Sequence, residues 1–143
     1  MTVKAILSRK GSNVITVEPT CTLADAVRIL SEHRIGALVI TGPEKHVAGI
    51  LSERDIVRAL AQRGTGALTE PVGQVMTRKV VTCTEADTVG ELMERMTQGR
   101  FRHVPVVDGG RLVGLVSIGD VVKHRLQEVE HESNALKEYI LTA

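Results

Sequence analysis

The sequence predicts an α+β protein built from two tandem units, each with the element order β-α-β-β-α, packed sheet to sheet with pseudo-twofold symmetry. Short β-rich runs alternate with segments in which apolar residues recur at helical spacing. The second half of the chain repeats the first, element by element. One unit alone would leave a three-stranded sheet half covered, so we expect the two sheets to pack against each other.

The first unit begins after a short apolar segment that Gly11 ends. Thr20 or Thr22 can cap the first long helix, and Asp25 suits the positive end of its dipole. Gly42 and Pro43 mark the turn of a hairpin. The expected elements are a helical turn within residues 1–12, a strand at 14–17, a helix at 22–33, strands at 37–40 and 46–52, and a helix at 54–62.

The second unit repeats these elements after a polar linker at 64–70 and a short helical turn at 71–76. VITV starts at residue 14 and VVTC at residue 80, an offset of 66, which becomes 65 after the hairpin because the turn at 108–110 is one residue shorter. The expected elements are strands at 80–83, 103–107 and 111–117 and helices at 88–98 and from 121 onward. We therefore divide the chain into unit one (1–70, with the N-terminal segment), unit two (71–130) and a C-terminal helical tail (131–143).

The tail extends beyond the length of the equivalent helix in unit one and carries a broken apolar stripe. We expect an interruption at Ser133–Asn134, with Asn134 capping a second helix that contains Leu136 to Leu141. An unused apolar stripe on a helix predicts contact with another subunit.

Composition excludes several classes of function. Hydrophobic residues make up 43% of the chain and charged residues 24%, which is typical of a globular protein. The net charge is +1 and aromatic residues make up 1%, so neither a basic patch nor stacking platforms for nucleic acid are expected. No segment is apolar enough to span a membrane, no signal sequence is evident, and the two cysteines have no metal-ligand spacing. We expect a cytoplasmic protein with reduced thiols, no bound metal and no membrane or nucleic-acid partner.

A doubled motif is the strongest functional signal. GILSERD at 49–55 and GLVSIGD at 114–120 each place a glycine before an apolar run, then a serine and an aspartate three residues on, at the start of a helix. A hydroxyl and a carboxylate at a helix start can hold a polyol or a phosphate, or they can form a helix cap with an acidic first turn. The matched repetition favours a ligand site over a cap alone.

Two such units resemble the cystathionine-β-synthase-type (CBS) domain pair, or Bateman module, in a stand-alone two-domain protein. The resemblance covers about residues 14–130 and includes EHRIGALVI at 32–40 and FRHVPVVDGG at 101–110. It implies that adenosine-containing ligands bind in clefts between the units, with the motif aspartates on the ribose hydroxyls and basic residues on phosphate.

The resemblance also implies which residues form the two sites. Asp55 and Asp120 would accept from ribose, with Ser52 and Ser117 beside them, and main-chain groups would frame the adenine. The full candidate set is Val14, Thr16, His33, Arg34, Gly36, Ala37, Leu38, Ser52, Arg54, Asp55, Val80, Thr82, Arg100, Arg102, His103, Val104, Pro105, Ser117 and Asp120. The units differ at the phosphate positions, so we expect two unequal sites.

The sequence therefore predicts a regulatory module that binds an adenine nucleotide, with AMP first and ADP, ATP or NAD(H) as alternatives. No nucleophile elbow, P-loop or dinucleotide-binding motif is present, so no catalytic residues and no enzyme activity are expected. The resemblance implies a homodimer that signals to a regulated protein on another chain. Two other functions stay open: a structural or oligomerisation module without nucleotide, and a sensor of S-adenosylmethionine.

Overall fold

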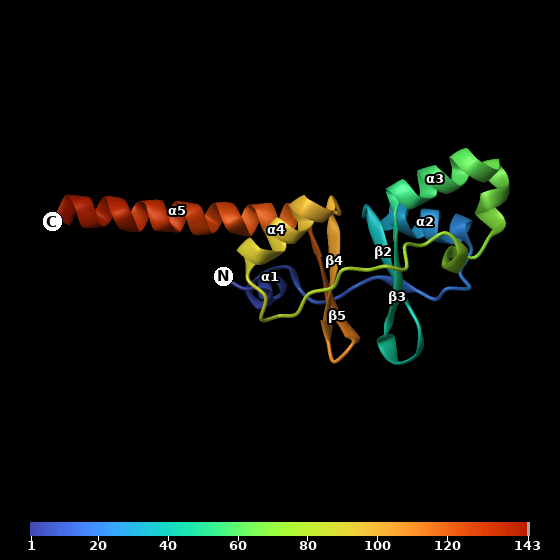
Figure 1. Ribbon diagram of the computed structural model, residues 1–143, viewed down its shortest axis with the longest axis horizontal. Helices are drawn as coiled ribbons and strands as arrows, with labels where there is room; N and C mark the ends of the chain where they lie inside the picture. The colour runs from blue at the N-terminus through green and yellow to red at the C-terminus, as the bar shows by residue number, and fades with distance from the viewer. Residues whose placement is uncertain (143) are drawn as a thin grey trace.

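A computed structural model of the chain describes residues 1–142 and has two small β-sheets side by side, with helices on their outer sides (Figure 1). This confirms the α+β class and the packing of one unit against the other. The α-helices and strands, in order, are α1 (Val3–Lys10), β1 (Thr16–Val17), α2 (Leu23–His33), β2 (Ala37–Thr41), β3 (Val47–Ser52), α3 (Glu53–Arg63), α4 (Val89–Gly99), β4 (His103–Asp108), β5 (Arg111–Ser117) and α5 (Ile118–Thr142), with short 3₁₀ turns at Pro43–Lys45, Gly64–Thr69 and Val72–Gln74.

The first unit follows the predicted order closely. Its sheet has the order β1-β2-β3, with β1 parallel to β2 and β2 antiparallel to β3. The Thr22 hydroxyl accepts a hydrogen bond from the backbone N–H of Asp25 at 3.2 Å, so Thr22 is the cap of α2. Three details differ from the prediction: α1 is an eight-residue helix instead of a single turn, the strand expected at 14–17 is limited to Thr16–Val17, and the linker at 64–69 is a 3₁₀ helix.

The predicted strand at 80–83 is wrong. Within this segment only Cys83 pairs with the sheet. Its N–H donates to the Pro105 carbonyl at 3.0 Å, and its carbonyl accepts from the Val107 N–H at 2.9 Å. In a parallel ladder of this register, the preceding pair of residues, 82 and 105, needs an N–H from residue 105. Proline has no N–H, so the ladder stops there. The second sheet therefore contains β4 and β5 only.

Two hydrophobic cores hold the molecule together. One takes in the N-terminal helix and the other takes in the segment that joins the units. Val3, Ile6 and Leu7 of α1 pack into the core formed by α4, β4, β5 and α5. Ala67 and Val72, from the segment that joins the units, pack into the core formed by α2, β2, β3 and α3. This packing ties the two repeats into one structure, and the division of the chain at residue 70 remains a prediction.

The glycine of each repeated motif marks a close approach of the chain. A Cβ atom on Gly49 would lie 2.5 Å from the Met76 sulfur and 2.8 Å from the Thr77 carbonyl oxygen. A Cβ on Gly114 would lie 2.7 Å from a methyl carbon of Leu7. Glycine at these positions lets Met76 and Thr77 lie directly on β3, and lets Leu7 of α1 lie directly on β5. Thr77 also exchanges two backbone hydrogen bonds with Ile50, at 2.9 and 3.0 Å.

Substituting Gly49 with alanine should therefore destabilise the protein. The added methyl group collides with the backbone at Thr77, and overpacking of this kind typically costs about 1–3 kcal/mol. Urea unfolding followed by circular dichroism measures the loss. Gly42→Ala is the matched control, because a Cβ on Gly42 meets no atom within 4 Å. Equal stabilities for the two variants would contradict the account of this contact.

The predicted break in the C-terminal helix at Ser133–Asn134 is also wrong. α5 is one continuous helix of 25 residues that extends away from the rest of the molecule (Figure 1). Neither glycine nor proline occurs between Asp120 and Thr142, and serine and asparagine lower helix propensity by only a few tenths of a kcal/mol, roughly, relative to the better helix formers. No helix in the described part of the chain is both long and apolar enough to cross a membrane.

Candidate functional site

The two repeated motifs fold into the same helix-capping turn. At the start of α3, the Ser52 hydroxyl accepts from the Asp55 N–H, and the Asp55 carboxylate accepts from the Ser52 N–H at 2.9 Å. At the start of α5, Asp120 and Ser117 make the same set of bonds. The cap interpretation is thus confirmed at both positions. In each turn one carboxylate oxygen, Oδ2, makes these bonds, and the surroundings decide what more the carboxylate can do.

A cleft of about 600 Å³ opens beside the Asp55 turn. One wall comes from β3 and α3 of the first repeat, and the other comes from the segment before Cys83 and from the α4–β4 connection of the second repeat. The residues that line the cleft are Gly36, Ile50, Ser52, Glu53, Arg54, Asp55, Arg58, Thr77, Lys79, Val80, Val81, Gly99, Arg100, Phe101, Arg102 and His103. A ligand in this cleft would contact both repeats.

Asp55 lines this cleft and is 5% exposed. Its second oxygen, Oδ1, accepts from the Thr77 hydroxyl at 2.9 Å and lies 3.8 Å from the Arg58 guanidinium. A carboxylate oxygen has two lone pairs, so Oδ1 can accept a further hydrogen bond from a ligand hydroxyl. The arrangement suits a group with adjacent hydroxyls.

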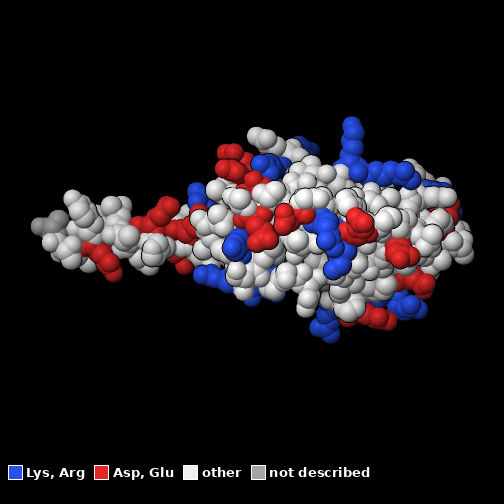
Figure 2. Space-filling model, turned by 90° about the horizontal axis from the view of Figure 1, so that it is seen from below, with Lys and Arg blue, Asp and Glu red and all other residues white. Residues whose placement is uncertain are grey.

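The walls of the cleft carry an excess of positive charge. Arg54, Arg58, Lys79, Arg100 and Arg102 line it, against the carboxylates of Glu53 and Asp55. Elsewhere the face of the molecule seen in Figure 2 mixes both signs without a large patch of either. A local surplus of guanidinium groups around a concave surface favours a ligand that carries phosphate.

His103 contributes to the cleft without adding charge at neutral pH. Burial lowers the pKa of His103, and Lys10 and Arg102 lower it further, although Glu53 and Asp120 act in the opposite direction. The neutral imidazole can donate one hydrogen bond and accept another. With its pKa lowered, His103 is suited to neutral hydrogen bonding with a ligand rather than to holding phosphate by charge.

The second turn, at Asp120, is engaged by a lysine. Lys10, the last residue of α1, donates from Nζ to Asp120 Oδ2 at 2.6 Å and to the Leu115 carbonyl at 2.9 Å. Met76 is the residue of the second repeat that corresponds to Lys10 at the offset of 66, so nothing equivalent reaches Asp55. Asp55 accepts a hydrogen bond from the neutral Thr77 hydroxyl, with the Arg58 guanidinium 3.8 Å away, whereas Asp120 accepts one directly from the Lys10 ammonium group.

The ion pair with Lys10 lowers the pKa of the Asp120 carboxyl. Burial alone would raise the pKa of this carboxyl, but the hydrogen bonds from Lys10 and from the Ser117 N–H, with the charge of Lys10, bring the pKa below its ordinary value of 3.8. A lowered carboxyl pKa stabilises the folded state above the unfolded pKa, and this contribution is lost as the pH falls through the folded pKa.

Lys10→Met should therefore be less stable than the natural chain at pH 7, by about 0.5–1 kcal/mol, because the pair is partly exposed to solvent. The difference should shrink as the pH falls below about 4, where Asp120 takes up a proton. Urea unfolding at pH 7 and pH 3 measures it, and Lys4→Met, on an exposed position of the same helix, is the control. A difference that stays constant with pH would show that the lysine stabilises the protein in another way.

The structure brings part of the candidate set into the Asp55 cleft: Gly36, Ser52, Arg54, Asp55, Val80, Arg100, Arg102 and His103. The others lie elsewhere. Leu38 and Val104 are fully buried in the two cores, while Ala37 and Pro105 are buried on the same strands. Arg34 lines a separate groove between α2 and α3, and His33 is exposed at the end of α2. Val14, Thr16, Thr82, Ser117 and Asp120 lie outside the residues that line this cleft.

Several residues of the cleft were not predicted. Arg58 lies one turn after Arg54 on α3, a spacing that could have indicated a shared face. Thr77 and Lys79 belong to the first part of the second repeat, between Gln74 and α4, whose path the sequence pattern does not define. Outside the cleft, the ion pair of Lys10 with Asp120 was also not predicted. A comparison of Lys10 with Met76, the corresponding residue of the other repeat, is the only sequence signal that could have indicated it. No group of three or more His, Cys, Asp or Glu side chains within residues 1–142 is placed to hold a metal ion.

Comparison with known proteins gives a consistent result. A family model of the CBS domain matches residues 3–62 and 72–127. The CBS-domain protein ATU1752 from Agrobacterium tumefaciens is 49% identical, with a TM-score of 0.83 over 87% of this chain and 92% of that one. The CBS domain pair of MJ0100, in complex with 5′-methylthioadenosine and S-adenosylmethionine, is 30% identical, with a TM-score of 0.79 over 90% of this chain and 98% of that one. PAE2072 from Pyrobaculum aerophilum, complexed with AMP, is 31% identical, with a TM-score of 0.75 over 84% of this chain and 89% of that one.

Proposed function

This chain belongs to the CBS domain family, and we propose that it is a regulatory module that binds an adenine nucleotide, AMP first among them, in the Asp55 cleft. The observation that carries the proposal is the combination of a buried carboxylate with a surplus of guanidinium groups in one cleft. The carboxylate suits the two ribose hydroxyls, and the cations suit the phosphate.

The charge of the cleft supports a phosphate-bearing ligand over S-adenosylmethionine. The sulfonium and amino groups of S-adenosylmethionine carry positive charge, and the cleft already has more cations than carboxylates. Solved relatives contain AMP in one case and S-adenosylmethionine with methylthioadenosine in another, so the adenosyl part of the ligand is common to both. The surplus of cationic side chains that line the cleft favours AMP here.

We propose that the ligand acts by shifting the relative position of the two repeats. The Asp55 carboxylate comes from the first repeat, whereas Lys79, Arg100 and Arg102 come from the second. A nucleotide held at both ends would favour the arrangement in which these groups lie at the right separation. A regulated protein on another chain would read that arrangement, in the cytoplasm, without catalysis by this chain.

Isothermal titration tests this function. We expect AMP to bind more tightly than adenosine, because adenosine lacks the phosphate, and to bind more weakly as salt is raised. ADP, ATP and NADH show how many phosphates the cleft accepts. Tighter binding of S-adenosylmethionine than of AMP would contradict the proposed ligand. No heat with any of these compounds would overturn the function and favour a structural module without nucleotide.

A further inference from the structure

The free part of α5 has an apolar stripe that the rest of the chain does not cover. Beyond Glu130 every described residue of the helix is exposed, and in Figure 2 this arm (left) is mostly uncharged atoms with acidic groups at intervals. Leu126 is 58% exposed, Leu136 60% and Ile140 66%. A soluble protein rarely leaves large aliphatic side chains aligned in water unless they contact a partner.

The stripe has the spacing of a coiled coil. We name as the α5 stripe the residues that recur alternately four and three apart along the helix: Val122, Leu126, Val129, Ser133, Leu136 and Ile140. In heptad notation Val122, Val129 and Leu136 are d positions, and Leu126, Ser133 and Ile140 are a positions. All but one are aliphatic, and the exception, Ser133, is a small residue near the middle.

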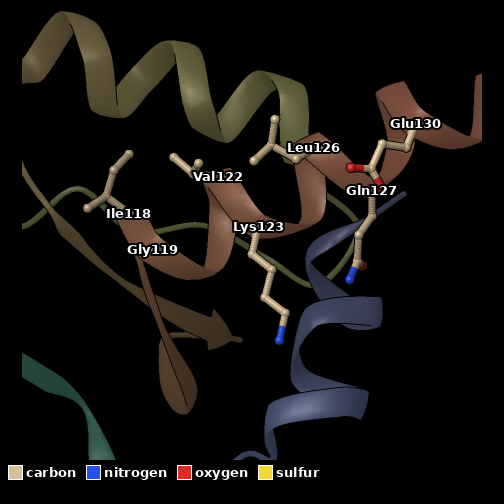
Figure 3. Close-up of a pocket in the computed structure, with 7 residues that line it drawn as sticks. All are labelled: Ile118, Gly119, Val122, Lys123, Leu126, Gln127 and Glu130. Carbon is tan, nitrogen blue, oxygen red and sulfur yellow. The ribbon is translucent and has the colours of Figure 1, made fainter. Parts of the chain in front are cut away.

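The stripe does not lie on the side of α5 that holds the helix to the molecule. Val121 and His124 are buried against α4 and β5, and Glu128 lies on the same side and contacts the N-terminus. Val122 and Leu126 point away from Lys123 and Gln127 in Figure 3. All four side chains line a groove of about 610 Å³ along the first turns of the helix. The stripe is thus continuous from this groove to the end of the described helix.

The charges beside the stripe identify its partner. In a parallel, in-register pair of helices, each g residue faces the e residue of the next heptad on the other chain. Here the g residues Arg125 and Glu132 would face Glu130 and Lys137 of a second copy, so both kinds of contact join opposite charges. We propose that α5 forms a parallel two-stranded coiled coil with α5 of a second copy of this chain.

Antiparallel pairing fits less well. If it is centred on the whole stripe, Glu130 lies beside Glu130 of the second copy and Glu132 beside Glu132, which brings like charges together. If it is shifted by one heptad, it leaves two aliphatic residues of each stripe uncovered, at one end or the other. Only the parallel arrangement covers the whole stripe and joins opposite charges.

Cysteine cross-linking of the full chain tests this arrangement. In the parallel pair residue 133 faces its own copy, so Ser133→Cys should give a disulfide-linked dimer on mild oxidation. Asn134→Cys, at a b position that faces away from the partner, should not. The natural chain controls for Cys21 and Cys83, which are partly buried and buried. A linked dimer with Asn134→Cys as readily as with Ser133→Cys, or with neither, would overturn the proposal.

A charge reversal separates the parallel pair from its alternatives. Sedimentation equilibrium should show that Glu132→Lys raises the dimer dissociation constant by about tenfold, and that adding Lys137→Glu restores it, because the parallel pair regains opposite charges at this contact. Glu138→Lys, at an f position that faces away from the partner, is the control. A natural chain that is monomeric at high concentration, or a double variant that stays weakened, would contradict the parallel coiled coil. Both positions are exposed, so neither variant should unfold.

Discussion

Asp55→Asn should weaken the binding of AMP by about 10- to 100-fold, because a hydrogen bond to a charged group contributes roughly 1.5–3 kcal/mol and the amide lacks the charge. The carboxylate lines the cleft and is 5% exposed, so little solvent can replace it. Asparagine keeps the size of the side chain and one oxygen acceptor, so the cap of α3 should persist. Isothermal titration measures the affinity, and circular dichroism checks the fold.

Asp120→Asn is the matched control, since Asp120 forms the same capping turn in the other repeat. Its carboxylate is bonded to Lys10 and lies outside the residues that line the Asp55 cleft, so AMP affinity should change by no more than about twofold. Equal losses at the two aspartates would contradict the inequality of the two sites.

Arg100→Gln and Arg102→Gln should each lower the affinity for AMP by about tenfold while leaving that for adenosine nearly unchanged. Both guanidinium groups lie on the wall of the cleft that the second repeat supplies. Loss of a cation lowers the affinity for a ligand with phosphate and leaves the affinity for a ligand without phosphate unchanged. Titration of each variant with AMP and with adenosine measures the two effects separately.

Arg34→Gln is an unusually close control for Arg100→Gln. Arg34 and Arg100 occupy the same position in the two repeats, and both end a helix in the left-handed conformation, with φ of 54° and 57°. Arg34 lines the groove between α2 and α3 instead of the Asp55 cleft. An effect of Arg34→Gln on AMP as large as that of Arg100→Gln would mean that the phosphate lies elsewhere.

The repeat made most of the fold predictable from the sequence. Helical spacing located α2, α3 and α4, and the two Ser-x-x-Asp motifs located the turns at which α3 and α5 begin. Cys83, which the repeat aligns with Val17, is 2% exposed, and burial raises the pKa of its thiol to about 12. These features follow from the local sequence pattern, and the pattern is easier to recognise because it occurs once in each repeat.

The features that the sequence did not predict depend on contacts between distant residues or on single backbone groups. The strand at 80–83 is missing because Pro105, which lies on β4 and far from this segment in sequence, lacks an N–H. Lys10 reaches Asp120 only because α1 packs into the core of the second repeat. The cleft itself is lined by Asp55 from one repeat and by Lys79 and Arg102 from the other. The spacing of apolar residues in the sequence does not indicate which distant residues lie close together.

The number of AMP molecules bound per chain tests the central claim most directly. Equilibrium dialysis at saturating AMP should give one per chain, because the Asp55 carboxylate lines the cleft, whereas Asp120 lies outside the residues that line it and is paired with the Lys10 ammonium group. Asp55→Asn should reduce occupancy at the same AMP concentration, and Asp120→Asn should not. Two molecules per chain, or none, would contradict a single nucleotide site at Asp55.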